Sequence, residues 1–193
     1  MATSLTDFKS ALVFGGARPS LFSFEVSGAP NGVSATLGNV QFYCSVSEIP
    51  PITLTPIERQ YFGRTVKIPG DLVFGDLTTT IINTEDFGVR NEIEKWMEVI
   101  NSSVENKGES GAVGNDSLEN ISGTAKLTHF QKNGSKTMTY EFVNIWPTSL
   151  TEIALSYDTA SDIEQFDCTW AYQYFKTPSE DQGSVVTQNP SQD

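Results

Sequence analysis

Few residues of the sequence could take part in enzyme chemistry. The chain has one histidine, His129, and two cysteines, Cys44 and Cys168. A histidine-based nucleophilic site needs a histidine beside a serine or cysteine nucleophile and an orienting carboxylate, and no such motif surrounds His129. A zinc site needs three or four clustered ligands, which one histidine and two distant cysteines do not supply. The sequence therefore predicts no metal and no cofactor, and both cysteines are interpreted as small apolar groups.

The remaining candidates for catalysis are glycine-rich and acidic segments. Gly15-Gly16 and the glycines of 108–114 lack the spacing of a phosphate-binding loop, which also has to open a helix after a strand. The pair Glu85-Asp86 has the residue types of a glycosidase acid and base. With 24 acidic residues in the chain, however, one such pair carries little weight. The sequence therefore indicates a binding or assembly protein rather than an enzyme.

Charge argues against a protein that grips nucleic acid. The 193 residues carry 12 basic and 24 acidic side chains, a formal net charge of −12. Proteins that hold DNA neutralise its phosphates with lysine and arginine. The segment with a basic excess is 123–149, where three lysines face one glutamate around an expected hairpin tip. Lysines at such a tip commonly serve solubility.

Hydrophobic patterning predicts a mainly β protein. Alternating apolar residues indicate strands with one buried face, and Asn133-Gly134 is a strong hairpin signal. Pro50-Pro51 and the apolar residues after it predict an extended loop over 47–60, and Pro69-Gly70-Asp71 predicts a turn. The expected strands are 21–26, 40–46, 61–68, 72–83, 124–132, 136–145 closed by Trp146-Pro147, 152–157 and 164–175.

One helix is expected over about 86–101. Its apolar residues recur at helical spacing, so they form one stripe that packs on the core. The stripe consists of Ile93, Trp96, Met97 and Ile100, and the expected polar face of Glu92, Glu94, Lys95 and Glu98. The predicted fold class is a two-sheet antiparallel β-sandwich or open barrel with one packed α-helix.

The expected organisation is an N-terminal arm (1–20), a β domain (17–176) and a flexible acidic C-terminal tail (177–193). The segment 102–122 is rich in Ser, Asn, Gly and Glu, and its length is typical of a functional or disordered loop. No run of apolar residues is long enough to span a membrane, and the first ten residues lack the features of a signal peptide.

Several stretches, in order, resemble the tail tube proteins of contractile-tailed bacteriophages of the T-even type. They cover about 17–175, and each is weakly specific alone, but their order and spacing together are specific. The stretches are Ala17-Arg18-Pro19-Ser20-Leu21-Phe22-Ser23-Phe24-Glu25-Val26, Phe42-Tyr43-Cys44, Phe62-Gly63-Arg64-Thr65-Val66-Lys67-Ile68-Pro69-Gly70-Asp71, Phe74, Asp76, Leu77-Thr78-Thr79-Thr80-Ile81-Ile82-Asn83, Ile145-Trp146-Pro147-Thr148-Ser149-Leu150, Leu155-Ser156-Tyr157-Asp158 and Ile163-Glu164-Gln165-Phe166.

The resemblance implies a structural virion protein. In that family six copies form a ring, four strands of each copy join a continuous inner barrel, and rings stack into a tube inside a contractile sheath. The implied partners are the sheath, baseplate and tail-terminator proteins, with the tape measure protein and the genomic DNA passing through the bore. Assembly takes place in the cytoplasm of the bacterial host. An acidic wall would suit such a bore, because a basic wall would hold the DNA at every ring.

Two other functions remain open from the sequence. The first is the same tube in a type VI secretion system or an extracellular injection system, which would carry protein rather than DNA. The second, from another class, is a soluble carbohydrate-binding β-sandwich. Its aromatic platform would be Trp170, Tyr172 and Tyr174, although their strict alternation suits a core face better.

The residues expected to join copies lie in the arm and in the segment 47–60. Apolar side chains with nothing local to cover them indicate burial against another chain. The expected contacts between rings or subunits are Phe8, Leu12, Pro50, Pro51, Ile52, Leu54 and Ile57. Polar residues that alternate with apolar ones suggest a lumen-facing set of Gln41, Ser45, Thr137, Thr139 and Glu141.

Overall fold

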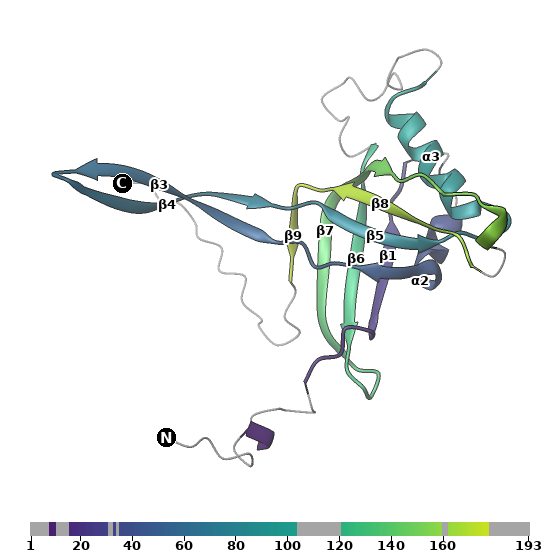
Figure 1. The fold of residues 1–193 in the computed structure, drawn as a ribbon, viewed down its shortest axis with the longest axis horizontal. Coiled ribbons are helices and arrows are strands. Elements are labelled where there is room, and N and C mark those ends of the chain that lie inside the picture. The colour runs from purple at the N-terminus through teal and green to yellow at the C-terminus, as the bar shows by residue number, and fades with distance from the viewer. Residues whose placement is uncertain are drawn as a thin grey trace.

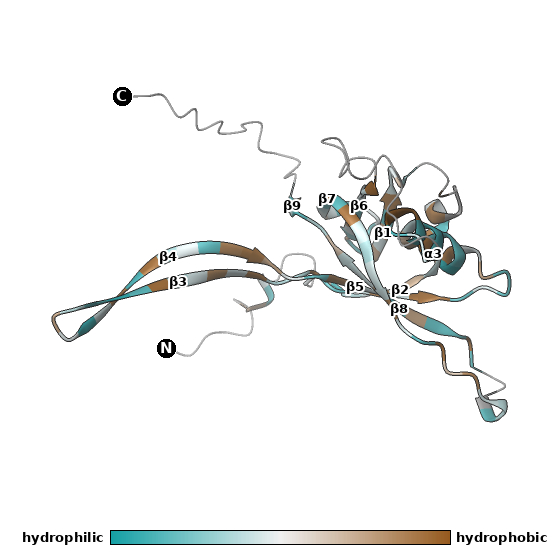
Figure 2. Ribbon diagram, turned by 90° about the horizontal axis from the view of Figure 1, so that it is seen from above, coloured by the Kyte–Doolittle hydropathy of each residue, from teal (hydrophilic) through white to brown (hydrophobic). Residues whose placement is uncertain are grey.

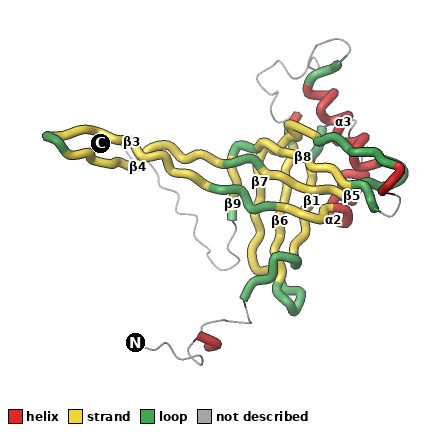
Figure 3. Tube along the Cα trace, in the orientation of Figure 1, coloured by secondary structure: helices red, strands yellow, loops and turns green. Residues whose placement is uncertain are grey.

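The computed structural model describes residues 8–10, 16–30, 33, 35–103, 121–159 and 162–177. These form two antiparallel sheets, a helix that covers them and a long hairpin that projects from the body (Figures 1 and 3). The expectations for the loop 102–122 and the tail 177–193 fall almost wholly outside the described residues. The elements are β1 (Phe22–Ser27), η2 (Ala35–Asn39), α2 (Val40–Tyr43), β2 (Cys44–Ser47), β3 (Ile52–Tyr61), β4 (Arg64–Phe74), β5 (Leu77–Ile82), α3 (Gly88–Ile100), β6 (Gly123–Phe130), β7 (Lys136–Leu150), η3 (Tyr157–Thr159), β8 (Gln165–Ala171) and β9 (Tyr174–Lys176).

Strand β7 belongs to both sheets and joins them. Its first part pairs with β6 and with β9, which gives sheet A the order β1-β6-β7-β9. Its last part pairs with β8, which gives sheet B the order β7-β8-β5-β2. The strand changes sheets near Asn144, whose φ is 53°. The predicted two-sheet antiparallel fold with one packed helix is therefore confirmed.

The strand β7 does not end at Trp146-Pro147, so that prediction was wrong. Pro147 lies opposite Trp170, and the ladder continues to Leu150. A register shift follows between Pro147 and Ser149. A proline has no N–H to donate, and it is tolerated in a sheet where a bulge relieves the pairing.

The core lies between the two sheets and under α3. Phe24 and Phe142 of sheet A are fully buried, as are Trp170 of sheet B and Trp96 of α3. The Trp96 and Trp170 rings meet edge to face at 5.9 Å between centroids. Each indole N–H has an acceptor, since Trp96 donates to the Ile121 carbonyl at 2.7 Å and Trp170 to the Thr79 hydroxyl at 2.9 Å. Burial of these rings without orphaned donors fixes how the helix sits on the sheets.

The helix α3 confirms the predicted stripe and corrects one residue of its polar face. Ile93 and Trp96 are fully buried. Glu92 is only 6% exposed, although it was expected on the polar face. It lies one turn before Trp96, at the edge of the stripe, and its carboxylate is 2.7 Å from the Lys95 ammonium. This ion pair compensates part of the cost of burying the charge.

Two segments expected to be strands take other conformations. Residues 40–43 form one helical turn before the short strand β2, although their alternation predicted a strand over 40–46. In this turn Val40 is buried and Phe42 exposed. Residues 152–156 are a loop, and Tyr157 begins η3. In both places the apolar spacing was too short to separate a strand from a turn.

The segment 47–60 is not an extended loop, because most of it forms β3, which pairs with β4 along its length. The two strands are joined by a two-residue turn, Phe62-Gly63, in which both residues have positive φ. Such a turn matches the twist of a β-hairpin. Pro56 lies opposite Pro69 in the register. Both prolines are tolerated because each strand of a two-stranded sheet has a free edge.

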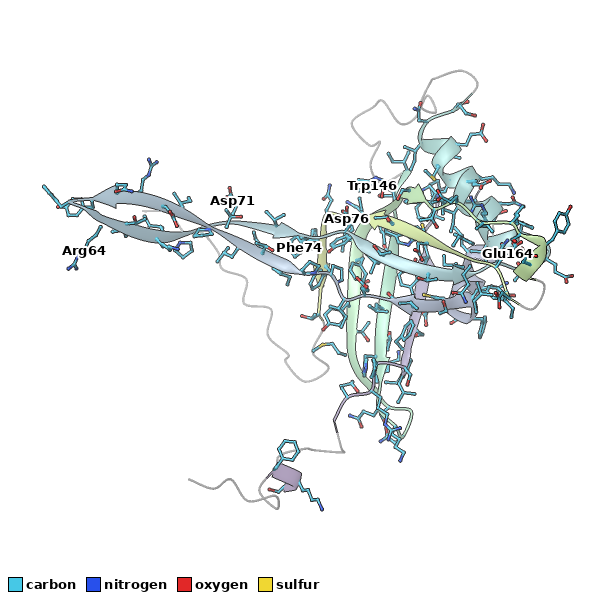
Figure 4. All side chains as sticks on the ribbon, viewed as in Figure 1. Arg64, Asp71, Phe74, Asp76, Trp146 and Glu164 are labelled. Carbon is cyan, nitrogen blue, oxygen red and sulfur yellow. The ribbon has the colours of Figure 1, made fainter. Side chains whose placement is uncertain are left out.

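Pro69-Gly70-Asp71 was predicted as the turn and instead contains a β-bulge. Two residues, Gly70 and Asp71, oppose Thr55 of β3. A bulge increases the local twist of the pair, and the two strands cross in this region, where Asp71 is labelled in Figure 4. A Cβ on Gly70 would overlap the Thr55 carbonyl oxygen and lie 2.8 Å from Cγ1 of Ile57. The close approach of the strands therefore requires glycine here.

We expect Gly70→Ala to loosen the hairpin without destabilising the body. The hairpin contributes no buried side chain to the core, so the thermal midpoint should shift by less than about 2 °C. Trypsin cleavage at Arg59, Arg64 and Lys67 should become several-fold faster, which limited proteolysis measures. Thr65→Ala, in the same strand, is the matched control. A cleavage rate equal to the control's would contradict a bulge that depends on glycine.

Candidate assembly surfaces

The projecting hairpin exposes apolar side chains on both faces. Figure 2 shows hydrophobic and hydrophilic residues along both of its strands. Residues directly opposite in the register share a face, so the faces can be assigned from the pairing. The base patch, on one face next to the body, consists of Ile52, Leu54 and Leu72. The tip face, on the other side beyond the bulge, consists of Ile57, Arg59, Tyr61, Arg64, Val66 and Ile68.

These apolar groups are exposed to an unusual degree for a monomer. Tyr61 is 67% exposed, and Phe62 in the turn is 91% exposed. Opposite the tip face, Glu58 and Lys67 form an ion pair at 3.2 Å on a polar face. An amphipathic hairpin with no core of its own is marginal in water. The tip face is therefore a candidate surface for contact with another chain.

An aromatic cluster fixes the direction of the hairpin at its base. Phe74 packs 5.4 Å from Phe175 and 6.2 Å from Tyr172, measured between ring centroids. The Tyr172 hydroxyl donates to the Gly75 carbonyl at 2.6 Å. Burial, and then the charge of Asp76, raises the pKa of Tyr172 to about 12, so the phenol keeps its proton. These contacts hold the hairpin in a fixed direction where it leaves the body beside β9.

The outer face of sheet A is polar and charge-balanced. Glu25, Lys126, Glu141 and Lys176 lie in one row across the four strands. Lys126 and Glu141 are 3.7 Å apart. On one side the row is flanked by Ser23, Thr128 and Thr139, and the Thr128 and Thr139 hydroxyls approach to 3.4 Å. On the other side Ser27 and Thr124 lie in a row that continues with Val143 and Tyr174. The face is therefore hydrophilic without the acidic excess of the whole chain.

Sheet A has a strand with an unpaired outer edge on each side. Among the described strands, β1 pairs only with β6 and β9 only with β7. All neighbours are antiparallel, so with four strands β1 and β9 run in opposite directions. A second copy could therefore continue the antiparallel pattern by placing its β1 against β9. An open edge of this kind is otherwise a site of uncontrolled association.

The structure brings together only part of the predicted lumen set. Glu141 and Thr139 lie on the polar face of sheet A, whereas Thr137 lies at a β-bulge between Lys136 and Met138, where alternation does not assign a face. Gln41 lies in α2, and Ser45 lies in β2 of sheet B, where its hydroxyl donates to the Thr80 carbonyl at 3.2 Å. Sequence reasoning missed Lys126, Glu25 and the other members of the row, because they come into line only through the strand register.

The predicted contact residues divide into three groups. Pro51, Ile52, Leu54 and Ile57 are exposed. Phe8 is 60% exposed in a short helical segment, whereas Leu12 lies outside the described residues. Pro50 is already buried in the free chain, unlike the exposed residues, and its contact with another copy stays a prediction. The partner strand supplies further exposed apolar residues that the loop interpretation had missed, namely Val66, Ile68, Leu72 and Val73.

The aromatic platform suggested for carbohydrate binding is not formed. Trp170 is fully buried in the core, and Tyr172 packs 4.9 Å from Phe142. Only Tyr174 of the three is exposed, at 38%. A stacking platform for a sugar needs exposed rings on one face, so the alternation of these residues was a core pattern.

The histidine and the two cysteines that were considered for catalysis or metal binding lie in environments typical of structural residues. His129 lies 2.8 Å from the Arg18 carbonyl through Nε2 and so ties the chain before β1 to the sheet. Burial raises the pKa of Cys44 to about 12 and that of Cys168 still further above its ordinary value, so both thiols stay protonated. The described residues contain no cluster of three or more potential metal ligands. No described helix is long and apolar enough to cross a bilayer.

The fold is similar to that of chains in extracellular contractile injection systems. The structure is similar to a subunit of the sheath/tube terminator of an extracellular contractile injection system, PVC, with a TM-score of 0.60 and 17% identity, covering 85% of this chain and 97% of that one. It is also similar to a subunit of the PVC sheath–tube complex in the extended state, with a TM-score of 0.55 and 18% identity over 91% of this chain and 98% of the other.

Sequence similarity identifies the protein family. The chain belongs to the phage tail tube protein family, whose model matches residues 13–178. It is 26% identical over 163 residues to tail tube protein gp19 of Enterobacteria phage T4, covering 83% of this chain and 91% of the relative. It is 25% identical over 175 residues to a tail tube protein of Serratia phage KSP90, covering 89% and 95%. Its role is accordingly that of a structural virion component of a contractile-tailed phage.

Proposed function

We propose that six copies of this chain close into a ring and that rings stack into the inner tail tube, which conducts the phage genome inside a contractile sheath. The observation that carries the proposal is the pair of unpaired edges of sheet A, which run in opposite directions. Membership of the phage tail tube family supports it. Closure of a sheet into a barrel is the arrangement that removes its edges altogether.

In this arrangement β9 of one copy pairs with β1 of the next, and sheet A forms the wall of the bore. Its polar face, with Thr139 and Glu141, lines the lumen, and Thr137 lies near the end of the same strand. The charges of the row across this face balance, so the wall is hydroxyl-rich and close to neutral rather than strongly acidic. Such a wall presents no phosphate-binding array of cations to DNA. The tape measure protein and the DNA pass along it without sequence-specific contacts.

The hairpin and the arm hold copies together. Ile52 and Leu54 of the base patch and Ile57 of the tip face become buried against neighbouring copies, with Pro51 beside them. Phe8 and Leu12 of the arm bridge subunits. The sheath surrounds the tube, and baseplate and terminator proteins bind its two ends. Assembly in the host cytoplasm then yields a tube that remains in the virion.

Negative-stain electron microscopy of the purified full-length protein tests the proposal. We expect six-fold rings with a central hole at moderate concentration, and hollow rods as the concentration rises. A protein that stays monomeric at high concentration would overturn the proposal.

A further inference from the structure

A second exposed surface lies at the end of the molecule opposite to the hairpin tip. The short helix η3 and its flanking residues lie at one end of the long axis, and the tip of β3–β4 lies at the other (Figures 1 and 3). We call residues 152–158 and 162–164 the acidic loop. Leu155 is 81% exposed, Tyr157 is 104% exposed, and Ile163 is 70% exposed. A hollow of about 400 Å³ lies among Ala154, Leu155, Ser156, Tyr157, Asp162 and Glu164.

The acidic loop and the tip face have opposite charge. The loop carries Glu152, Asp158, Asp162 and Glu164 and no basic residue. The tip face carries Arg59 and Arg64 and no acidic residue. Neither arginine forms an ion pair with a described residue. Each surface therefore combines uncovered apolar side chains with uncompensated charge of one sign, and the two are complementary in both respects.

Both surfaces lie on segments that connect strands of sheet B. The hairpin connects β2 to β5, and the acidic loop leads into β8. Figure 2 shows the two on the side of the body where β2, β5 and β8 lie, at opposite ends. In Figure 1 the hairpin extends past β9, along the direction in which sheet A would add the strands of another copy. A copy added there, turned so that sheet A curves around its polar face, brings its acidic loop toward the tip.

We infer that the tip face of each copy docks on the acidic loop of the neighbouring copy in the same ring. The inference rests on the proposed ring and names the surface that the hairpin recognises. Tyr61 and Phe62 pack against Leu155 and Tyr157 at the hollow, and Arg59 and Arg64 pair with Asp158 and Asp162. The contact is heterologous, from the head of one copy to the tail of the next, and such a contact closes when the rotation between copies fits a ring.

Charge reversal on each surface tests the pairing. Arg59→Glu with Arg64→Glu should raise the concentration needed for ring formation at least roughly tenfold, and so should Asp158→Lys with Asp162→Lys. The chain with all four substitutions should recover assembly. Glu58→Lys with Lys67→Glu reverses the ion pair on the polar face and is the matched control, which should assemble like the wild type. Equal assembly of all these variants, or no recovery in the fourfold variant, would overturn the inference.

A disulfide cross-link tests the geometry directly. In Tyr61→Cys/Leu155→Cys the two thiols of one copy lie at opposite ends of the molecule, so a bond can form only between copies. Oxidation should give a ladder that stops at the size of the ring, whereas each single variant gives monomer on a non-reducing gel. Rings without cross-links, or a ladder that runs beyond one ring, would refute the contact while leaving the proposed tube intact. Failure of the wild type to form rings would instead reject the tube, and the inference with it.

Discussion

A chain in which residues 55–71 are replaced by Asn-Gly should fold normally and build no tubes. In the register Leu54 lies opposite Leu72, so a two-residue turn at this point closes the shortened hairpin in the geometry that Asn-Gly favours. The change removes the tip face and the bulge but no buried side chain of the core. We expect the thermal midpoint to stay within about 2 °C of the wild type. Electron microscopy and light scattering should show no rods at concentrations at which the wild type assembles.

The natural control for this replacement is a chain that keeps the hairpin and alters only its polar face. Gln60→Ala with Thr65→Ala changes side chains that lie opposite one another on that face, and it should assemble like the wild type. Rods of normal length from the shortened chain would show that the hairpin is dispensable. An unfolded shortened chain, detected by circular dichroism, would show instead that the hairpin supports the body, which contradicts its lack of buried contacts.

Trp170→Ala should lower the free energy of unfolding by about 3–5 kcal/mol. The side chain is fully buried, packs on Phe24 and Trp96, and donates from its indole nitrogen to the buried hydroxyl of Thr79. Its removal leaves a cavity between the sheets and takes a donor from Thr79. Chemical denaturation followed by circular dichroism measures the change. The loss is a large share of the stability of a domain of this size.

Tyr157→Ala provides the comparison for this measurement. Tyr157 is fully exposed in η3, so its replacement should change the free energy of unfolding by less than about 0.5 kcal/mol. If tubes form, the same variant should weaken them, because the side chain lies in the acidic loop. A loss of less than 1 kcal/mol on Trp170→Ala would contradict a core centred on the two tryptophans.

Periodic segments were predicted well because their burial follows local spacing. The hairpin around Asn133-Gly134 and the stripe of α3 agree with the structure, since turn chemistry and helical period act within a few residues. The hairpin β3–β4 was misplaced because proline and glycine were interpreted as breaks. Here Pro56 and Pro69 face each other and Gly70 forms a bulge, which depends on the register between the two strands and not on the residues next to each proline or glycine.

The assembly surfaces were only partly predictable for the same reason. Exposed apolar residues of β3 could be recognised from the lack of anything local to cover them, as with Ile52 and Leu54. Their partners on β4 and the charge row of sheet A appear only once the register is known. The resemblance to tail tube proteins supplied what patterning alone could not, which is that identical copies complete the fold.

A cryo-electron microscopy map of the assembled tube tests the central claim most directly. The account predicts continuous backbone density in which β9 of each copy adds to β1 of the next, with the polar face of sheet A turned to the bore. Those edges would then be unpaired only in the free chain. A tube in which sheet A faces outward, or in which β1 and β9 remain unpaired while other surfaces join the copies, would contradict it.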